Sequence, residues 1–268
     1  MRRAYVTTLS GGDAYLPGVE ALGRSLVGTG TSASRVVLIT EDVSAVARAQ
    51  LQEQGWQLQL IEPIPSPDPD AAPLYARFSK TFTKLRAFGL SDFDKIVLLD
   101  ADTVVLRNVD DLFERPSFSA APDFFLPDRF NSGVMVVEPS PALFATLEQA
   151  LHKCRSYDGG DQGFLNEFFP TWYEGPSAHR LRAGYNLHHF VFQFLLGRET
   201  LREQVLDEVR IIHFTLQKPW QNVTLSGGAD LWWRFYFEAH PEEDRPWRRR
   251  LHQLEDWSFD SLVRVMGG

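Results

Sequence analysis

Two hydrophobic periodicities alternate along the first part of the chain. Compact apolar runs predict strands over residues 4–9 and 36–40, and the alternation of Trp56, Leu58 and Leu60 predicts a third strand over 56–60. Between these runs, apolar side chains recur every three or four positions after Pro17 and after Ser44, which predicts two helices. Proline suits the first position of a helix, and serine suits the cap before it. The succession of strand, helix, strand, helix and strand is typical of an α/β sheet with crossover helices.

The alternation continues beyond a segment that is rich in proline. Residues 62–73 contain five prolines, which predict an exposed loop because proline cannot donate a backbone hydrogen bond. The elements expected after this loop are strands before Asp100, over 134–137 and before His213, and helices over 79–90, 141–153 and after Asp161.

The end of the chain is rich in large aromatic residues. Leu231, Trp232 and Phe235 have the spacing of an amphipathic helix, and Trp247 and Trp257 follow. Large aromatic residues at helical spacing favour core packing over a sugar-binding face. We expect one α/β domain over residues 1–220 and a helical extension over 221–268.

Composition and charge narrow the range of partners. The chain has 268 residues, of which 44% are hydrophobic, so it can bury a substantial core. Its net charge of −8 argues against nucleic acid as a partner, because such binding needs clustered Lys and Arg. Cys154 is the only cysteine, which excludes an internal disulfide and fits a reducing cytoplasm. The sequence does not fix the oligomeric state, and a homodimer stays open.

Targeting and membrane signals are not expected in this sequence. The first residues include two arginines but no continuous apolar stretch of the kind found in signal peptides. No later run approaches the length needed to cross a bilayer. We therefore expect a cytoplasmic protein without a membrane span.

Two carboxylates follow the apolar run 96–99 directly. Asp100 and Asp102 are two positions apart, so in an extended chain their side chains point the same way. Their mutual repulsion and burial would be costly unless a cation offsets them. Oxygen ligands suit Mg²⁺ or Mn²⁺, and ligands of open α/β sheets bind beyond the carboxyl ends of strands. The structural alternative is that one aspartate caps a turn and the other is solvated.

Other polar groups complement this pair. Asp158, Asp161 and Gln162 lie among glycines just before an apolar helix, where Asp161 could also serve as the helix N-cap. His213 ends a strand, and Lys218 follows in a turn before Pro219. Each group alone has a structural explanation, but together they offer carboxylates and an imidazole for a divalent cation and an ammonium for a phosphate.

Eight segments occur in an order that carries a family resemblance between Ala4 and Trp220: VTTLSGGDAY, TKLRAFGL, LLDADTVVLRNVDDLFE, APD, FNSGVMVVEPS, DGGDQGFLN, YNL and HFTLQKPW. In this order they resemble the glycogenin-type and galactinol synthase-type members of glycosyltransferase family 8. The resemblance implies an α/β GT-A fold, a Rossmann-like mixed sheet flanked by helices. It also implies retaining transfer of a hexose from a UDP-sugar.

The resemblance further implies roles for individual residues. The metal, Mn²⁺ or alternatively Mg²⁺, would be held by Asp100, Asp102 and His213. Catalysis around the transferred sugar would involve Asp158, Asp161, Gln162 and Lys84. The donor site would be formed by Thr8, Leu9, Tyr15, Arg77, Lys84, Asp100, Ala101, Asn131 and Lys218.

The sequence departs from glycogenin at three places. The segment VTTLSGGDAY, which contains Thr8 and Leu9, is one residue longer than its counterpart. The spacing from His213 to Lys218 is one residue shorter and lacks the glycine of the family pattern. The position of the self-glucosylated tyrosine falls on Gln193, which has no hydroxyl to accept a sugar. We therefore expect transfer from UDP-glucose or UDP-galactose to a separate acceptor, a small polyol, a saccharide or a glycan.

Two rival interpretations remain. LLDADTV also fits the nucleophile signature of haloacid dehalogenase-type phosphohydrolases, with Asp100 as the nucleophile and Asp102 as acid and base. That signature normally opens the first strand of its domain, whereas three strands are expected before it here. The second rival is a UDP-sugar binding protein that no longer transfers sugar.

Overall fold

The computed structural model describes residues 1–67, 76–221 and 229–242. The chain divides into two compact units, and both are discontinuous in sequence. The first unit consists of Met1–Leu16, Ser32–Ala101 and Asp110–Arg182. The second consists of Pro17–Thr31, Asp102–Val109 and the described residues from Ala183 onward. The domain boundary expected at residue 220 stays a prediction.

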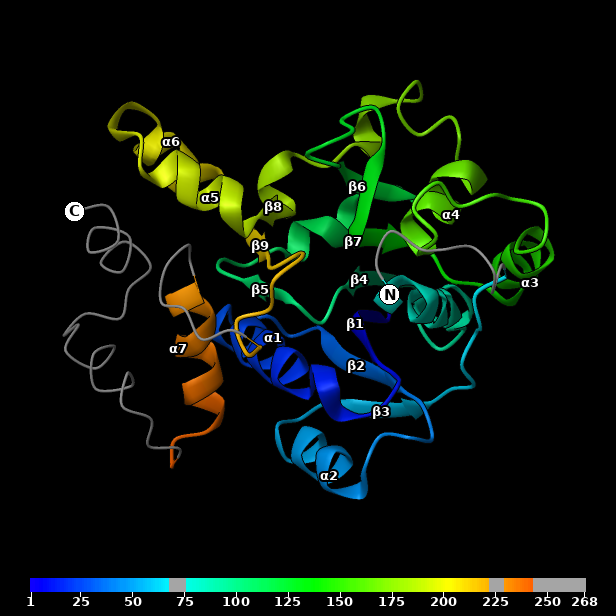
Figure 1. Ribbon diagram of the computed structural model, residues 1–268, viewed down its shortest axis with the longest axis horizontal. Coiled ribbons are helices and arrows are strands. Elements are labelled where there is room, and N and C mark those ends of the chain that lie inside the picture. The colour runs from blue at the N-terminus through cyan, green and yellow to red at the C-terminus, as the bar shows by residue number, and fades with distance from the viewer. Residues whose placement is uncertain (68–75, 222–228, 243–268) are drawn as a thin grey trace. The chain divides into compact units, whose positions relative to one another are not determined.

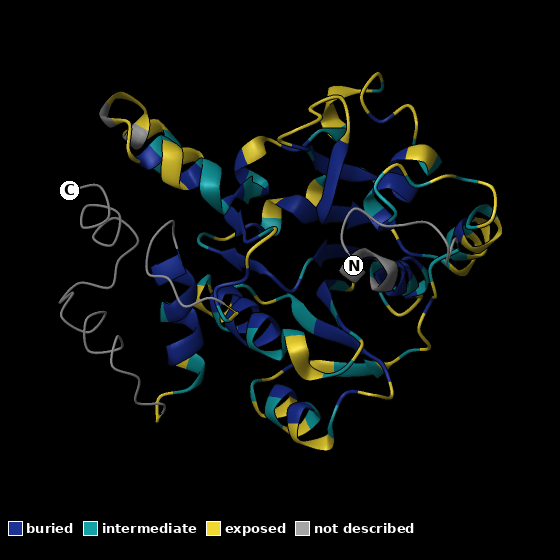
Figure 2. Ribbon diagram, viewed as in Figure 1, coloured by how far each residue is buried: buried dark blue, intermediate teal, exposed yellow. Residues whose placement is uncertain are grey.

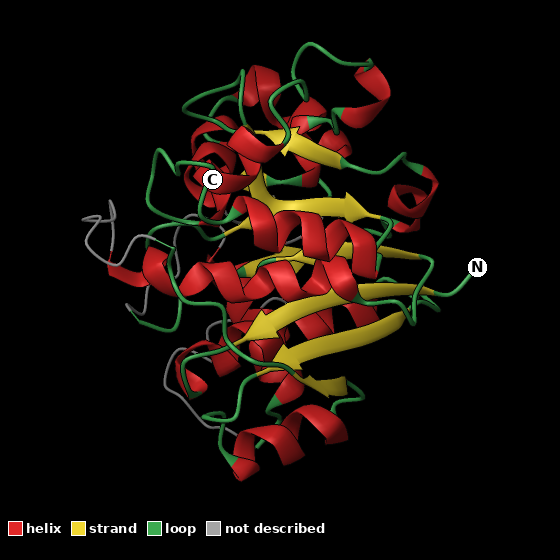
Figure 3. Ribbon diagram, turned by 90° about the vertical axis from the view of Figure 1, so that its right-hand side faces the viewer, coloured by secondary structure: helices red, strands yellow, loops and turns green. Residues whose placement is uncertain are grey.

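The first unit is built on a six-stranded sheet with the order β3-β2-β1-β4-β7-β6. Strands are drawn in yellow and helices in red in Figure 3. The four strands from β3 to β4 are parallel, and β7 and β6 are antiparallel to their neighbours. This mixed sheet confirms the predicted α/β class. Its strands are β1 (Arg3–Leu9), β2 (Ser34–Ile39), β3 (Gln57–Leu60), β4 (Lys95–Leu99), β6 (Ser119–Pro122) and β7 (Phe130–Val137).

The sheet topology places the donor-site candidates at one edge. Val6 of β1 pairs with Leu98 of β4, so Thr8 and Asp100 each lie two residues further toward the carboxyl ends of adjacent parallel strands. Every residue of β4 and β7 is buried, as the dark blue of these central strands shows (Figure 2). The strand predicted over 134–137 is longer than expected, because β7 begins at Phe130.

Two helices of this unit, α2 and α3, begin where the sequence predicts. Ser44 caps α2 and Ser140 caps α3, each through its side-chain oxygen. The helix expected over 79–90 is a 3₁₀ helix, Ala76–Gly89. Leu60 was expected to alternate into the core but is exposed, because β3 lies at the edge of the sheet. The helices are α2 (Ala45–Glu53), α3 (Pro141–Ala150) and α4 (Asp161–Phe168), with short 3₁₀ helices Asp13–Tyr15, Asp110–Glu114 and Ser177–His179.

The second unit has its own sheet and its own core. Its three strands have the order β5-β9-β8. Trp232 and Trp233 are almost fully buried and pack within an aromatic cluster, which confirms the predicted core role of this helix. The elements are β5 (Thr103–Val105), β8 (Leu187–His188), β9 (Ile211–His213), α1 (Leu16–Gly28), α5 (His189–Leu196), α6 (Glu199–Glu208), α7 (Ala229–Ala239) and the 3₁₀ helix Ala183–Tyr185 (Figure 1).

Some expectations fall on residues outside the described part of the chain. Trp247, Trp257 and the second half of the proline-rich segment belong to this group. Within the first half of that segment, Ile64 is buried and its amide donates to the Thr83 hydroxyl, so the loop is not exposed throughout. Across residues 1–67, 76–221 and 229–242, no helix is both long and apolar enough to span a bilayer.

Candidate active site

Lys84 is the centre of a buried cluster in the first unit. Its side chain rises from the 3₁₀ helix Ala76–Gly89, and its Nζ lies 2.8 Å from Asp100 Oδ1 and 2.8 Å from Asp161 Oδ2. It also donates to the Ser132 hydroxyl at 3.2 Å. Burial alone would lower the pKa of Lys84, but Asp100 and Asp161 outweigh burial and raise it. The Lys84 ammonium group therefore stays protonated between the two carboxyl groups.

Asp161 joins this cluster because it is not the cap of its helix. Gly160 occupies the N-cap position of α4 and makes no side-chain cap, so the alternative role proposed for Asp161 is wrong. The backbone N–H of Asp161 donates to the Thr81 hydroxyl at 3.1 Å. The carboxylate of this first helical residue is thus turned to Lys84 instead of to the helix backbone.

Asp158 shapes the turn before α4. Its Oδ1 accepts hydrogen bonds from the Ser156 hydroxyl at 2.8 Å, from Gly160 N at 2.9 Å and from Gly163 N at 3.1 Å. A Cβ on Gly163 would lie only 2.7 Å from the backbone nitrogen of Tyr157, so this turn needs glycine. One oxygen of Asp158 therefore organises the loop that presents Asp161 and Gln162, and a direct part in catalysis stays a prediction.

Gln162 and Asn131 meet at a residue that sequence analysis did not single out. Gln162 Nε2 lies 3.3 Å and Asn131 Nδ2 lies 3.0 Å from the same oxygen, Asp123 Oδ2. Gln162 Nε2 also donates to the Tyr157 hydroxyl at 3.2 Å. Burial, the first cause, raises the pKa of Tyr157 to about 12, so its hydroxyl stays protonated. The position of Asp123 directly after β6 was the signal that could have identified it.

A second cluster lies within the second unit. Asp102 follows β4 in the chain, and its Oδ2 accepts a hydrogen bond from Lys218 Nζ. Its other oxygen, Oδ1, lies 3.1 Å from Nε2 of His213, the last residue of β9. Burial would raise the pKa of Asp102, but Lys218 and the protonated form of His213 outweigh burial and hold it far below its usual range.

The orientation of His213 indicates a cation site. His213 Nδ1 lies 2.9 Å from Asn186 Oδ1, an acceptor, so Nδ1 carries the proton and Nε2 of a neutral ring has a lone pair. This lone pair faces Asp102 Oδ1, and two acceptors at such a distance need a cation or a proton between them. A metal ion satisfies both, because neutral imidazole and carboxylate oxygens are common ligands of divalent cations.

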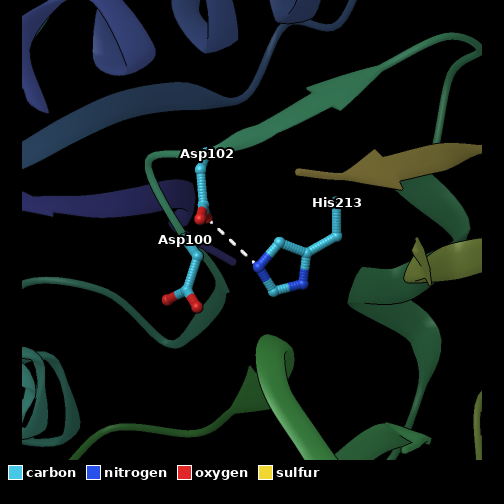
Figure 4. Close-up of side chains that lie close together, drawn as sticks. All are labelled: Asp100, Asp102 and His213. Atoms are coloured by element: carbon cyan, nitrogen blue, oxygen red, sulfur yellow. Dashed lines mark ion pairs between the residues drawn. The ribbon is translucent and has the colours of Figure 1, made fainter. Parts of the chain in front are cut away.

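The three expected metal ligands come together. Asp100, Asp102 and His213 each offer one ligand atom, and these atoms lie within 4.8 Å of one another. Figure 4 shows the His213 ring turned toward the Asp102 carboxylate, with Asp100 beside it. The donor set of two carboxylates and one imidazole fits Mn²⁺ or Mg²⁺ with positions left for other ligands.

The turn between His213 and Lys218 is built without glycine. Leu216 takes a φ of 66°, in the left-handed region that glycine normally occupies. This conformation allows Lys218 Nζ to donate back to the carbonyl of Phe214 at 2.9 Å as well as to Asp102. The shortened turn therefore keeps the Lys218 ammonium at the site, although Leu216 is strained.

The remaining donor-site candidates lie at the carboxyl edge of the large sheet or near it. Thr8 is half-buried near the end of β1, while the Leu9 side chain is fully buried and leaves only its backbone for a ligand. Tyr15 is half-buried in the 3₁₀ helix Asp13–Tyr15, and Ala101 is buried. The side chain of Arg77 lies outside the described part of the structure.

Comparison with known proteins reveals relatives of one enzyme class. The chain is 38% identical to glycogenin-1 of Caenorhabditis elegans over 245 residues, which cover 90% of this chain and 56% of that protein. It is 36% identical over 236 residues to inositol phosphorylceramide glucuronosyltransferase 1 of Arabidopsis thaliana, covering 81% and 42%. The chain thus spans about half the length of these relatives.

One family model and several solved structures also match the chain. A family model described as "Mannosyltransferase putative" matches residues 61–133. A crystal structure of an active-site mutant of LgtC superposes with a TM-score of 0.64 at 18% identity, covering 91% of this chain and 99% of LgtC. That likeness shows the GT-A fold. The sequence relatives place the chain in the glycogenin-like group of glycosyltransferase family 8.

Proposed function

We propose that this chain is a retaining, metal-dependent glycosyltransferase that moves a hexose from a UDP-sugar to a hydroxyl group of a separate acceptor. The observation that carries the proposal is the convergence of Asp100, Asp102 and His213 on one another. A bound Mn²⁺ or Mg²⁺ would supply Lewis-acid stabilisation of the negative charge that develops on the departing diphosphate.

The residues of the chain have complementary tasks in this proposal. Asn186 fixes the ring of His213, and Lys218 neutralises one oxygen of Asp102. The Lys218 ammonium is also the group that would meet the diphosphate, because its positive charge matches the charge that forms there. Thr8, Leu9, Tyr15, Ala101 and Arg77 are proposed to surround the nucleoside.

The neighbourhood of the transferred sugar favours a same-face route. Asp161 Oδ2 is paired with Lys84, which reduces its strength as a nucleophile for a covalent intermediate. Gln162 is neutral and directs its amide toward Asp123 and Tyr157, so it can offer hydrogen bonds without taking up a proton. We propose that Gln162 and Asn131 orient the sugar while Lys84 holds Asp161 in place.

The acceptor is proposed to be a separate molecule. Gln193 is exposed on α5 between the buried Phe192 and the exposed Phe194, and it has no hydroxyl to receive a sugar. The donor is proposed to be UDP-glucose or UDP-galactose. Because several relatives are named as glucuronosyltransferases, UDP-glucuronate belongs in the same test.

The rival interpretations are less well supported. A phosphohydrolase with Asp100 as its nucleophile would need a free carboxylate, but Asp100 Oδ1 is held by Lys84. The phosphohydrolase signature would also belong to the first strand of its sheet, whereas three strands, β1, β2 and β3, precede the strand that leads to Asp100. A binding protein without transfer activity would not need the buried pair of Asp161 and Lys84.

The proposal is tested by hydrolysis of UDP-sugars without acceptor. The wild-type protein with Mn²⁺ should release UDP from at least one of UDP-glucose, UDP-galactose and UDP-glucuronate, and EDTA should abolish the release. Asp102→Ala removes a ligand and should lower kcat by at least about 100-fold, because the charge on the leaving group loses its stabilisation. Asp92→Ala removes an exposed carboxylate just before β4 and should retain full activity. UDP release that is equal in Asp102→Ala and the wild type would refute the proposal.

A further inference from the structure

A pocket lies at the amino ends of the central strands of the large sheet. Its volume is about 380 Å³, near the lower end of the range typical of small-molecule sites. Arg3 pairs with Lys95, the first residue of β4, whereas Asp100 follows the last residue of that strand. The pocket and Asp100 are therefore separated by roughly 17 Å along β4, so the pocket is distinct from the candidate active site. Its walls include Arg2, Arg3, Ser34, Phe93, Asp110 and Phe113.

Two charged side chains of the pocket are held in place by other residues. Arg3 donates to Glu114 Oε1 at 2.6 Å, and its guanidinium group lies 5.6 Å from the centre of the Phe113 ring. Asp110 Oδ1 accepts a hydrogen bond at 2.7 Å from the hydroxyl of Tyr5, a residue of β1 that is almost fully buried. A ligand that binds these two side chains would therefore lose little conformational entropy by ordering them.

The walls of the pocket combine donors, acceptors and aromatic surface. A guanidinium group has five N–H donors, so Arg3 keeps donors beyond those in its ion pair, and Arg2 adds more. An oxygen of the Asp110 carboxylate can accept more than one hydrogen bond, and the Ser34 hydroxyl can both donate and accept. Phe93 is half-buried and adds an aromatic surface. A matching ligand has both hydrogen-bonding groups and an apolar face.

The charges of the pocket argue against an anion as its ligand. Arg2 and Asp110 have opposite charges, and the charge of Arg3 is offset by Glu114. A phosphate would be attracted by the arginines but repelled by both carboxylates.

The polar groups of the pocket also argue against a purely apolar ligand. Such a ligand would cover Arg3 and Asp110 without forming hydrogen bonds to them, which is unfavourable. A saccharide fits better, because its neighbouring hydroxyl groups can bind charged side chains while the C–H groups of its ring pack on an aromatic ring.

We propose that the pocket is a second binding site, which takes a neutral saccharide. The inference goes beyond the proposed function, because binding at this end of the strands requires no transfer. In a glycosyltransferase, a saccharide held here would keep a glycan attached to the enzyme while another part of the same glycan accepts the sugar. Such attachment raises the effective concentration of the acceptor. That consequence rests on the proposed function, whereas the binding does not.

Binding is tested by nuclear magnetic resonance on the full ¹⁵N-labelled chain with UDP and Mg²⁺. The backbone amides of Ser34 and Phe93 report on the walls of the pocket. Maltose and lactose are the saccharide probes, and inorganic phosphate, benzyl alcohol and uridine represent an anion, an apolar ligand and a ribonucleoside. At least one saccharide should shift both resonances to saturation, and the other three compounds should not. No shift with either saccharide, or equal or larger shifts with another compound, would overturn the proposal.

Two variants connect these shifts to the pocket. Asp110→Ala removes the carboxylate and should weaken saccharide binding at least about 10-fold, as expected for hydrogen bonds to a charged group. Asp111→Ala removes the neighbouring exposed carboxylate, which does not line the pocket, and should keep the wild-type affinity. Circular dichroism checks the folding of both variants. Equal affinities of Asp110→Ala and the wild type would contradict the inference.

A third variant leaves the contact between Asp110 and Tyr5 intact. Arg2 is exposed and precedes β1, so Arg2→Ala should fold even where Asp110→Ala does not. It should weaken saccharide binding about 3-fold or more, and an unchanged affinity would equally refute the proposal. Saccharide shifts in a wild-type chain that releases no UDP from any UDP-sugar would count against the proposed function alone. The two can therefore fail separately.

Discussion

At the scale of single residues, Asn186 determines which nitrogen of His213 can bind a cation. The Asn186 oxygen accepts the Nδ1 proton at 2.9 Å, and both side chains are buried. Groups that orient a metal-binding histidine in this way contribute to metal affinity although they do not touch the metal. Asn186 lies in the segment YNL, but no local pattern distinguishes an asparagine whose side chain contacts a histidine 27 residues later.

Substitution of Asn186 should weaken metal binding without removing a ligand. Asn186→Ala is expected to lower Mn²⁺ affinity about 10- to 100-fold, since His213 loses the partner that fixes its tautomer. Electron paramagnetic resonance of free Mn²⁺ measures the affinity, and the ¹⁵N shifts of the His213 ring report its tautomer. Asn186→Asp offers the same acceptor and should restore both. Loss of affinity with an unchanged tautomer would show that Asn186 has another role.

At the scale of elements, the turn after β9 contains a residue in an unfavourable backbone conformation. Leu216 is an L-residue in the left-handed region, and its side chain is 37% exposed, so packing contributes little to hold it there. The conformation costs about 1–2 kcal/mol relative to the right-handed region. This unfavourable free energy is offset by the hydrogen bond from Lys218 to Asp102, which the turn makes possible.

Glycine at this position should relieve the strain. Leu216→Gly is expected to increase the free energy of unfolding by about 1 kcal/mol, after allowance for the greater freedom of glycine in the unfolded chain. Urea denaturation measures the change. Leu216→Ala removes a similar part of the side chain but keeps the strain, so it should give no gain. Equal stability of the two variants would argue against the strain.

The first turn of α7 contains a carboxyl group in an apolar setting. Asp230 is 8% exposed, and its Oδ1 has no hydrogen-bond partner among the residues that the structure describes. Burial raises the pKa of Asp230 to about 6, against a smaller opposing effect of a backbone hydrogen bond. Between pH 4 and 6 the folded chain therefore retains a proton that the unfolded chain has lost.

The sign of this shift predicts lower stability at higher pH. The contribution of Asp230 should decrease by about 3 kcal/mol as the pH rises from 4 to 7, and then stay constant, because above the folded pKa neither state holds the proton. Asp230→Asn cannot titrate, so its stability relative to the wild type should grow over this range. Urea denaturation at pH 4.5 and 7.5 measures the difference. A difference that does not depend on pH would contradict the assignment.

At the scale of the whole molecule, the proposed metal would join residues that are far apart in the chain. Asp102 directly precedes β5, and His213 is the last residue of the antiparallel strand β9. The two residues are close because Thr103 of β5 pairs with His213. The backbone of Phe214 also donates to the Asp102 carbonyl at 2.8 Å. A ligand that binds such an arrangement only in the folded state stabilises the fold.

Metal binding should therefore raise the melting temperature. At a Mn²⁺ concentration 100 times Kd, the gain is about 2.7 kcal/mol, which corresponds to an increase of roughly 5–10 °C for a chain of this size. Differential scanning calorimetry with Mn²⁺ and then with excess EDTA measures the effect and its reversal. Asp102→Ala should show no such increase. An equal increase in the variant would place the metal elsewhere.

Much of the fold follows from local patterns, and the failures have physical causes. Apolar periodicity predicted β1, β2, β4, α1 and α7, and the cap of α2 lies at the expected serine, Ser44. The 3₁₀ geometry of 76–89 was not predicted, because apolar spacing does not distinguish it from an α-helix. The exposure of Leu60 depends on β3 being an edge strand, which is a property of the sheet.

The sequence by itself determined the α/β class, the acid pair after an apolar strand and the family, because these depend on periodicity and on the order of short motifs. Only the tertiary structure revealed Asp123, Asn186 and Tyr157 as partners of the candidate residues, and Lys84 as the cation between Asp100 and Asp161. The physical reason is that hydrogen bonds and ion pairs depend on distance in space. Strand pairing and chain crossovers set that distance between residues that no local pattern connects.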